Sequence, residues 1–190
     1  MRIPGRWRRG YALDYHTIRS EFIGYNEFGH PQYDTTYTEL GELLYRLKYQ
    51  SDHSSIGGIV GAVAEFVETW RPGVDVLVPV PATRTRAVQP VMLLGEALAR
   101  RLGLLFAPDW VRKVRDVPEL KNVHDLEERL HLLEGAHEAN RAMVEGHRVL
   151  LFDDLYRSGA TMNAIAGALY DQGGAVEVYA LTLTRTRKKR

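Results

Sequence analysis

Three short apolar runs separated by helical patterns constrain the fold of this chain more than any other feature. The runs are residues 74–80 (VDVLVPV), 148–152 (RVLLF) and 175–183 (AVEVYALTL). Helical patterns cover residues 90–102 after the first run and 161–172 after the second. Continuous apolar runs linked by helices are typical of parallel strands buried on both faces. The sequence therefore predicts an α/β fold, with a parallel central sheet flanked by helices.

The remaining pattern adds a hairpin, two helices and two short strands. Residues 18–37 are rich in Tyr, Phe, Ile and Thr around a central turn, which predicts a hairpin. Thr38 is placed to cap a helix whose leucines share one face. A second amphipathic helix is predicted over residues 56–70, and short strands over residues 104–107 and 110–114.

These elements suggest a division of the chain. We expect a hairpin or hood segment over residues 1–37 and the main domain over residues 38–184. Residues 115–140 are charged and weakly periodic apart from a helical stretch at 126–133, and we expect a mobile excursion or lid there rather than core. The basic tail, residues 185–190, is expected to be solvated rather than ordered.

Composition narrows the functional classes. The chain has 190 residues, 45% of them hydrophobic and 26% charged, which suits one domain with a real core. The net charge of +1 does not call for nucleic acid or an anionic membrane. The absence of cysteine excludes disulfides, cysteine nucleophiles and Cys-ligated zinc. No apolar run approaches the ~20 residues of a membrane span, and no secretory signal is evident, so we expect a cytoplasmic protein.

Two adjacent acids stand where the second apolar run ends. Asp153 and Asp154 follow the strand directly, and small residues then lead from Ser158 to Thr161 at a helix start. Carboxylates accept hydrogen bonds from vicinal diols and hold hydrated Mg²⁺, while a helix N-terminus favours phosphate. In the alternative interpretation Ser158 or Thr161 is only an N-cap and the acids are solvated. The ordered run of strand, acids and loop favours a ribose-5-phosphate site.

The segment VLLFDDLYRSGAT, residues 149–161, resembles the thirteen-residue motif of the type I phosphoribosyltransferases that binds phosphoribosyl pyrophosphate (PRPP). Arg157 departs from the motif, because a Thr is common there, and it adds a cation near the phosphate. The resemblance implies that Asp153 and Asp154 are catalytic and hold Mg²⁺ indirectly. It implies that the ribose and its 5-phosphate are bound by Asp153, Asp154, Arg157, Ser158, Gly159, Ala160 and Thr161.

A second set of residues resembles the ComF-like branch of that family. Val78-Pro79-Val80-Pro81 is intact, Ala87-Val88-Gln89-Pro90 is a degenerate form of the segment that follows, and GELLYRLKYQ resembles an upstream helix ending in Leu-Lys-Tyr. Arg129 and Gly135-Ala136 also match, whereas Lys121 stands where a Gln is usual. The zinc module frequent in this branch is absent, because the chain has no cysteine. The resemblance covers roughly residues 40–184.

The loop after the first apolar run binds pyrophosphate in that family. Arg84 and Arg86 are suitable donors, because guanidinium groups pair bidentately with phosphate oxygens. The alternative is two exposed arginines on a polar loop. The implied pyrophosphate-binding residues are Pro81, Ala82, Thr83, Arg84, Thr85 and Arg86, with Arg84 and Arg86 also catalytic. Lys113, Arg115 and Lys121 are candidates for a closing loop, but a solvated charged face is the favoured interpretation.

The resemblance implies a PRPP-dependent phosphoribosyltransferase of nucleotide metabolism. An unidentified acceptor, a nucleobase or an amine, would displace pyrophosphate with assistance from Mg²⁺. A second hypothesis is a non-catalytic PRPP- or nucleotide-binding module acting in DNA uptake or processing, and a third is a nucleic-acid adaptor using the basic termini. The family often forms homodimers, and the sequence leaves the oligomeric state open.

For the remaining histidines and tryptophans, a structural role is the favoured interpretation. His124, His131 and His137 do not match a known metal spacing, so a solvated face is expected. Trp7 lies among arginines, for which a disordered terminus is favoured over contact with nucleic acid or membrane. Trp70 and Trp110 are expected to pack in the interior.

Overall fold

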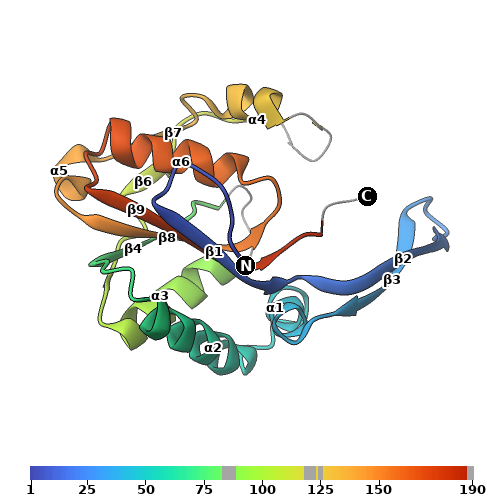
Figure 1. Ribbon diagram of the computed structural model, residues 1–190. Helices are drawn as coiled ribbons and strands as arrows, with labels where there is room; N and C mark the ends of the chain where they lie inside the picture. Colours follow the sequence, from blue (N-terminus) through green and yellow to red (C-terminus); the bar gives the residue numbers. More distant parts are fainter. Residues whose placement is uncertain (83–88, 118–122, 124–125, 188–190) are drawn as a thin grey trace.

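A five-stranded parallel sheet forms the centre of the computed structural model, which describes residues 1–82, 89–117, 123 and 126–187 (Figure 1). The strand order is β1-β9-β8-β4-β5, and every neighbouring pair is parallel. The strands are β1 (Arg9–Tyr15), β4 (Val76–Pro79), β5 (Leu105–Phe106), β8 (Arg148–Tyr156) and β9 (Glu177–Arg185). The predicted α/β class with a parallel sheet is confirmed.

Helices cover both faces of this sheet (Figure 1). One face carries α1 (Glu39–Tyr49), α2 (Ser55–Trp70) and α3 (Pro90–Leu102), and the other carries α6 (Ala160–Asp171), with α4 (Leu126–Leu133) and α5 (Arg141–Val144) on the same side. Successive residues of β8 enter different cores, since Leu151 packs with α6 whereas Leu150 and Phe152 pack with α1 to α3. This alternation explains why the strand is apolar at every position from Val149 to Phe152.

The helix ends follow the local signals in the sequence. The Thr38 hydroxyl accepts a hydrogen bond from the Gly41 backbone N–H at 3.1 Å and caps α1. Gly103, with φ of 68°, ends α3 in the left-handed region. Both predictions are confirmed.

The N-terminal segment belongs to the central sheet. β1 pairs in parallel with β9, with Arg9 opposite Tyr179. Trp7 is buried, and its indole N–H donates to the Ile3 carbonyl at 3.0 Å. The expected disordered terminus is therefore wrong, because Trp7 and Ile3 join the core beside α6. The structure also differs from a division after residue 37, since β1 forms the edge of the main sheet beside β9.

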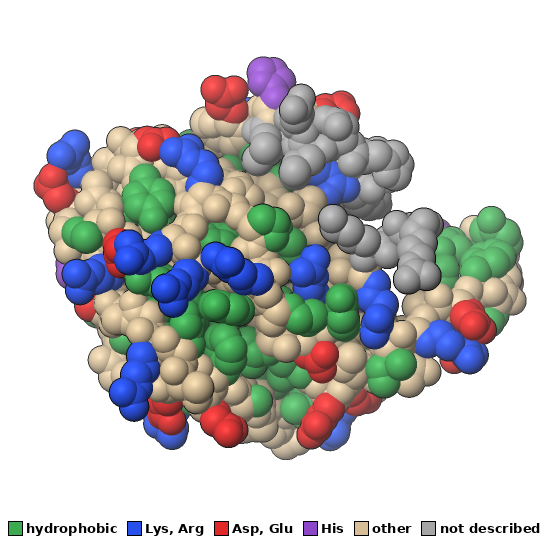
Figure 2. Space-filling view, viewed as in Figure 1, with side chains coloured by type: hydrophobic (Ala, Val, Ile, Leu, Met, Phe, Trp, Pro, Cys, Tyr) green, Lys and Arg blue, Asp and Glu red, His purple; other side chains and the backbone are tan. Residues whose placement is uncertain are grey.

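A hairpin projects from the body of the molecule (Figure 1). β2 (Thr17–Tyr25) and β3 (Pro31–Tyr37) form an antiparallel two-stranded sheet, which confirms the predicted hairpin. Figure 2 shows hydrophobic side chains gathered at its far end. The exposed hydrophobic side chains of this segment are Ile18, Phe22, Ile23, Tyr25, Phe28 and Tyr33.

The charged segment 115–140 is partly core, which corrects the expectation of an excursion. β7 (His137–Ala139) pairs with β6 (Val111–Lys113), and both Leu133 and Ala136 are buried. His137 is buried as well, so the solvated face expected for it is wrong. Of the described apolar residues of this segment, Leu133, Ala136 and Ala139 are buried. His124 and Lys121 lie outside the described residues.

The tail also departs from its expectation. Arg185 is the last residue of β9, and the Arg187 Nε donates to the Thr17 carbonyl at 3.0 Å. The Arg187 guanidinium lies 4.2 Å from the centre of the Tyr15 ring, a cation–π contact. Residues 185–187 are thus held against the fold, and residues 188–190 lie outside the description. None of the described helices is long and apolar enough to cross a membrane.

Candidate functional site

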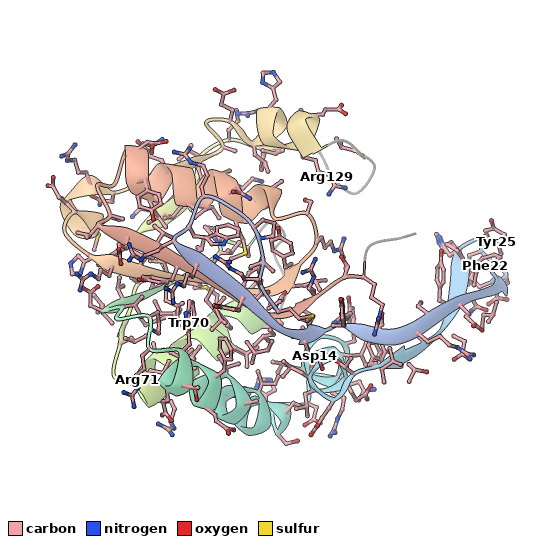
Figure 3. All side chains as sticks on the ribbon, in the orientation of Figure 1. Asp14, Phe22, Tyr25, Trp70, Arg71 and Arg129 are labelled. Carbon is pink, nitrogen blue, oxygen red and sulfur yellow. The ribbon has the colours of Figure 1, made fainter. Side chains whose placement is uncertain are left out.

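A pocket of about 150 Å³ lies where β8 runs into α6. It is lined by Asp153, by residues 155–162 and by Arg129 of α4. Figure 3 shows the Arg129 side chain on the side of α4 that faces α6. The pocket lies at the carboxyl end of the sheet, where open α/β folds bind their ligands. The structure therefore brings together Asp153 and the whole predicted phosphate loop, and we call this the β8–α6 pocket.

The loop of the β8–α6 pocket depends on a glycine. Gly159 has a φ of 78°, and a Cβ placed on it would lie 2.5 Å from Cε2 of Tyr156. Gly159 is also the N-cap of α6, so no side chain caps this helix in the described structure. Neither Ser158 nor Thr161 is therefore the cap residue, although the Ser158 Oγ accepts a long hydrogen bond of 3.4 Å from the Ala160 N–H. The first turn of α6 keeps backbone N–H groups that suit an anion.

Asp153 is the acid that lines the β8–α6 pocket. Its Oδ1 accepts a hydrogen bond of 2.8 Å from the Asp154 backbone N–H. Burial and then the neighbouring Asp154 carboxylate raise the pKa of Asp153 to about 8, against smaller lowering effects of Lys48 and Arg157. Around neutral pH this carboxyl group can therefore both donate and accept a hydrogen bond.

Asp154 takes a different partner. Its Oδ2 lies 2.7 Å from Nζ of Lys48 on α1, and the two side chains are only 13% and 12% exposed. The sequence analysis did not single out Lys48 as a site residue, although it noted the Leu-Lys-Tyr ending of this helix. The structure thus separates the two acids, since Asp154 is absent from the lining of the β8–α6 pocket.

A histidine completes the surroundings of Asp154. The Thr184 hydroxyl donates to the Asp154 carbonyl at 3.3 Å, and the His16 Nδ1 lies 3.2 Å from the same hydroxyl oxygen. Burial and then the charge of Lys48 lower the pKa of His16, so its ring is neutral around pH 7. His16 was also missed by the sequence analysis, because it sits in the turn between β1 and β2, far from the motif.

The second predicted loop begins at the same edge of the sheet. β4 and β8 are in register from Val76 opposite Val149 to Pro79 opposite Phe152, and the Val80 N–H donates to the Phe152 carbonyl at 2.8 Å. Pro81 and Ala82 follow at the surface. The other implied pyrophosphate-binding residues, Thr83, Arg84, Thr85 and Arg86, lie outside the described residues, so their role stays a prediction.

Two basic residues considered for a closing loop have other partners. Lys113 pairs with Asp116 at 2.9 Å, and the Arg115 guanidinium donates to the carbonyls of Leu132 and Glu134. Neither lines the β8–α6 pocket. Trp70 and Trp110 pack as predicted, with Trp70 edge-on to Tyr11 at 5.0 Å between ring centres and Trp110 buried.

The carboxylates at this edge of the sheet offer few direct ligands for Mg²⁺. In the described part of the chain, no three His, Asp or Glu side chains are grouped to hold a metal ion. Asp153 offers a carboxyl group to the pocket, whereas Lys48 already occupies one oxygen of Asp154. Asp153 could therefore accept hydrogen bonds from water molecules bound to a Mg²⁺ ion that enters with a phosphate ligand. Asp154 does not fit as a direct ligand of the ion.

Comparison with known proteins gives partial matches. The chain is 29% identical over 157 residues to the competence protein ComFC of Bacillus subtilis, covering 80% of this chain and 62% of that protein. It is 38% identical over 86 residues to the adenine phosphoribosyltransferase of Solibacter usitatus, covering 44% of this chain and 47% of that protein. The chain thus spans less than two thirds of either relative. No family model matches it.

One solved structure is also similar in outline. The adenine phosphoribosyltransferase of Thermoanaerobacter pseudethanolicus has 22% sequence identity and a TM-score of 0.47, covering 89% of this chain and 84% of the other.

Proposed function

We propose that this chain is a PRPP-dependent transferase. Its relatives in sequence support the resemblance to the type I phosphoribosyltransferases and to the ComF-like branch. The observation that carries the proposal is the β8–α6 pocket. The end of β8, the loop after it and α4 bring a carboxyl group, two arginines and a helix N-terminus to a single pocket. A sugar diol next to a phosphate group matches this chemistry.

Different residues of the pocket would bind different parts of PRPP. Asp153 would hydrogen-bond the ribose hydroxyls, and residues 157–161 would surround the 5-phosphate with backbone N–H groups and the Ser158 and Thr161 hydroxyls. Arg157 and Arg129 would add charge-assisted hydrogen bonds. The chain after Pro79, including Arg84 and Arg86, would hold the pyrophosphate at the neighbouring strand end.

The reaction is a displacement at the anomeric carbon. The bond from this carbon to pyrophosphate breaks, pyrophosphate leaves with the electron pair, and the acceptor nitrogen forms the new bond and loses its proton to solvent. Arg84 and Arg86 would stabilise the negative charge that develops on the departing pyrophosphate. Mg²⁺ carried by PRPP would supply further stabilisation of that charge, and Asp153 would hold its water shell.

The acceptor is proposed to be a nucleobase, with adenine first, because several relatives are adenine phosphoribosyltransferases. The test is pyrophosphate release from PRPP and Mg²⁺ with a panel of nucleobases and amines. We expect release with one acceptor class, and its loss in Asp153→Asn. Turnover that survives Asp153→Asn would contradict the assignment.

A second function is supported by a different observation. The match to ComFC covers more of this chain than the matches to the transferases do. A non-catalytic PRPP-binding module in DNA uptake would give saturable PRPP binding without pyrophosphate release across the whole panel. The role in competence, the homodimer and the cytoplasmic location stay predictions.

A further inference from the structure

We propose that Lys48 and Asp154 form a positioning ion pair, so that Asp153 alone of the two acids contacts the ribose of the substrate. The inference rests on the proposed function and refines it. The sequence motif alone assigns the same ribose-binding role to both acids. In the folded chain they point to opposite faces of β8, and only one of them faces the pocket.

Strand geometry separates the acids first. Side chains alternate across a strand, so residues 150, 152 and 154 share one face of β8 and residues 151 and 153 share the other. Leu150 and Phe152 pack against α1 to α3, whereas Leu151 packs with α6. Asp154 therefore faces α1, and Asp153 faces the loop that leads into α6.

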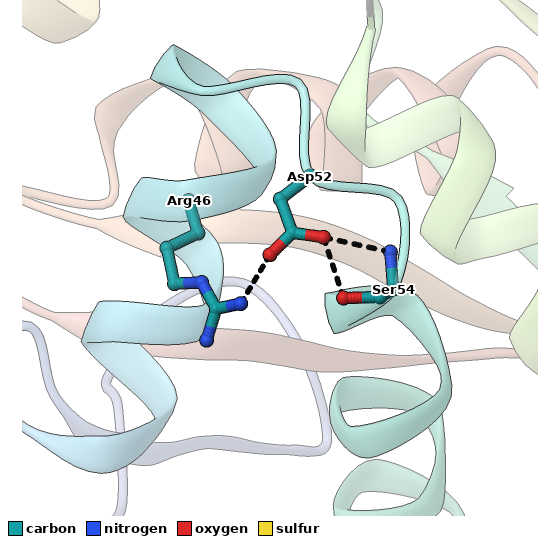
Figure 4. Close-up of polar contacts among 3 residues, drawn as sticks. All are labelled: Arg46, Asp52 and Ser54. Atoms are coloured by element: carbon teal, nitrogen blue, oxygen red, sulfur yellow. Dashed lines mark hydrogen bonds and ion pairs between the residues drawn. The ribbon is translucent and has the colours of Figure 1, made fainter.

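The fold holds Lys48 in place opposite Asp154. Leu44 and Leu47 are fully buried, which seats the last turns of α1 on the sheet. The turn that follows is also tied, because Asp52 binds the Arg46 guanidinium and accepts hydrogen bonds from the Ser54 N–H and hydroxyl (Figure 4). A lysine on a fixed helix end has little freedom to release its partner.

Among the described residues, no other cation pairs with Asp154 as closely as Lys48 does. Among the described groups that act on this region, His16 is neutral and bonds to Thr184, while Arg157 lines the β8–α6 pocket beside Asp153. A buried carboxylate whose cation is removed is strongly disfavoured. Contact between Asp154 and a ribose hydroxyl would require this ion pair to open, whereas contact with Asp153 requires no rearrangement.

Replacing both charges tests the inference. The variants are Lys48→Met, Asp154→Leu and the double variant K48M/D154L, with Lys113→Met as a lysine control outside the pocket. PRPP affinity is measured by calorimetry with Mg²⁺, and folding by circular dichroism. Each single change leaves a buried charge unpaired, so we expect PRPP affinity to fall by about tenfold or more. The double variant leaves no unpaired charge, and we expect its affinity to return to within about threefold of the wild type.

The outcomes separate the two claims. A folded double variant that binds PRPP as weakly as Asp154→Leu overturns the inference, because Asp154 is then a ligand contact. If K48M/D154L does not fold, the neutral hydrogen-bonding pair K48Q/D154N replaces it under the same criterion. Asp153→Asn should remain weak in every background. A wild type that fails to bind PRPP removes the proposed function, and the inference with it.

Discussion

Gly159 and Tyr156 lie so close that a Cβ on the glycine would stand 2.5 Å from the Tyr156 ring. The Tyr156 ring cannot easily retreat, because its hydroxyl donates to the Pro4 carbonyl at 3.1 Å and the residue is buried. The left-handed backbone at Gly159 and this contact together set the path of the loop into α6.

Gly159→Ala should therefore lower the free energy of unfolding by about 1–3 kcal/mol, because it adds backbone strain and a steric clash. It should also weaken PRPP binding, since the loop would move. Thermal denaturation and calorimetry measure the two effects. Gly61→Ala on the exposed side of α2 is the control, because its Cβ meets nothing and alanine favours a helix. Wild-type stability and wild-type PRPP affinity in Gly159→Ala would contradict this account of the loop.

The raised pKa of Asp153 predicts a dependence of stability on pH. The folded group titrates near pH 8, whereas an unfolded aspartate titrates near pH ~4, so the folded state keeps a proton that the unfolded state has lost. The stabilising effect is complete below pH ~4 and is lost as pH rises through about 8. Relative to Asp153→Asn, the wild type should lose at most about 1.4 kcal/mol per pH unit in this window. A difference that is constant from pH 5 to 9 would be inconsistent with this pKa.

The N-terminal segment should be required for stability. Trp7→Ala removes a buried ring and its hydrogen bond to Ile3, and we expect a loss of about 3 kcal/mol in the free energy of unfolding. Chemical denaturation gives this value. Tyr25→Ala at the exposed hairpin end is the matched control and should change stability by less than about 0.5 kcal/mol. Equal effects for the two variants would argue against the placement of Trp7.

Arg157 is the residue of the loop that departs from the family pattern. It lines the β8–α6 pocket, and a charge-assisted hydrogen bond to phosphate is worth about 1.5–3 kcal/mol. Arg157→Ala should therefore weaken PRPP binding by about tenfold or more, with little change in melting temperature. Arg112→Ala, at an exposed position of β6, should leave the affinity unchanged. An Arg157 variant with full affinity would show that the arginine is directed to solvent.

Local signals predicted most of this fold. β4, β8 and β9 could be predicted because strands buried on both faces contain nearly continuous apolar runs. The end of α3 could be predicted because a glycine such as Gly103 readily adopts the left-handed conformation. β1 was missed because its pairing with β9 joins the two ends of the chain. The burial of Leu133, Ala136, His137 and Ala139 was not predicted, because charged residues surround them in the sequence.

The candidate site was predicted in part. The motif located Asp153 and residues 157–161 because all of them lie in one continuous segment. It could not show that Asp154 faces Lys48, since that contact joins α1 to β8 across more than half of the chain. Arg129 was noted only through the resemblance, and its place in the pocket depends on how α4 packs above α6.

Calorimetric titration of the wild type and Asp153→Asn with PRPP and Mg²⁺ tests the central claim most directly. The account predicts saturable binding of one PRPP per chain by the wild type, and an affinity lower by about tenfold or more in Asp153→Asn, because a ribose contact is lost. The absence of binding by the wild type, or equal affinity in both proteins, would contradict it.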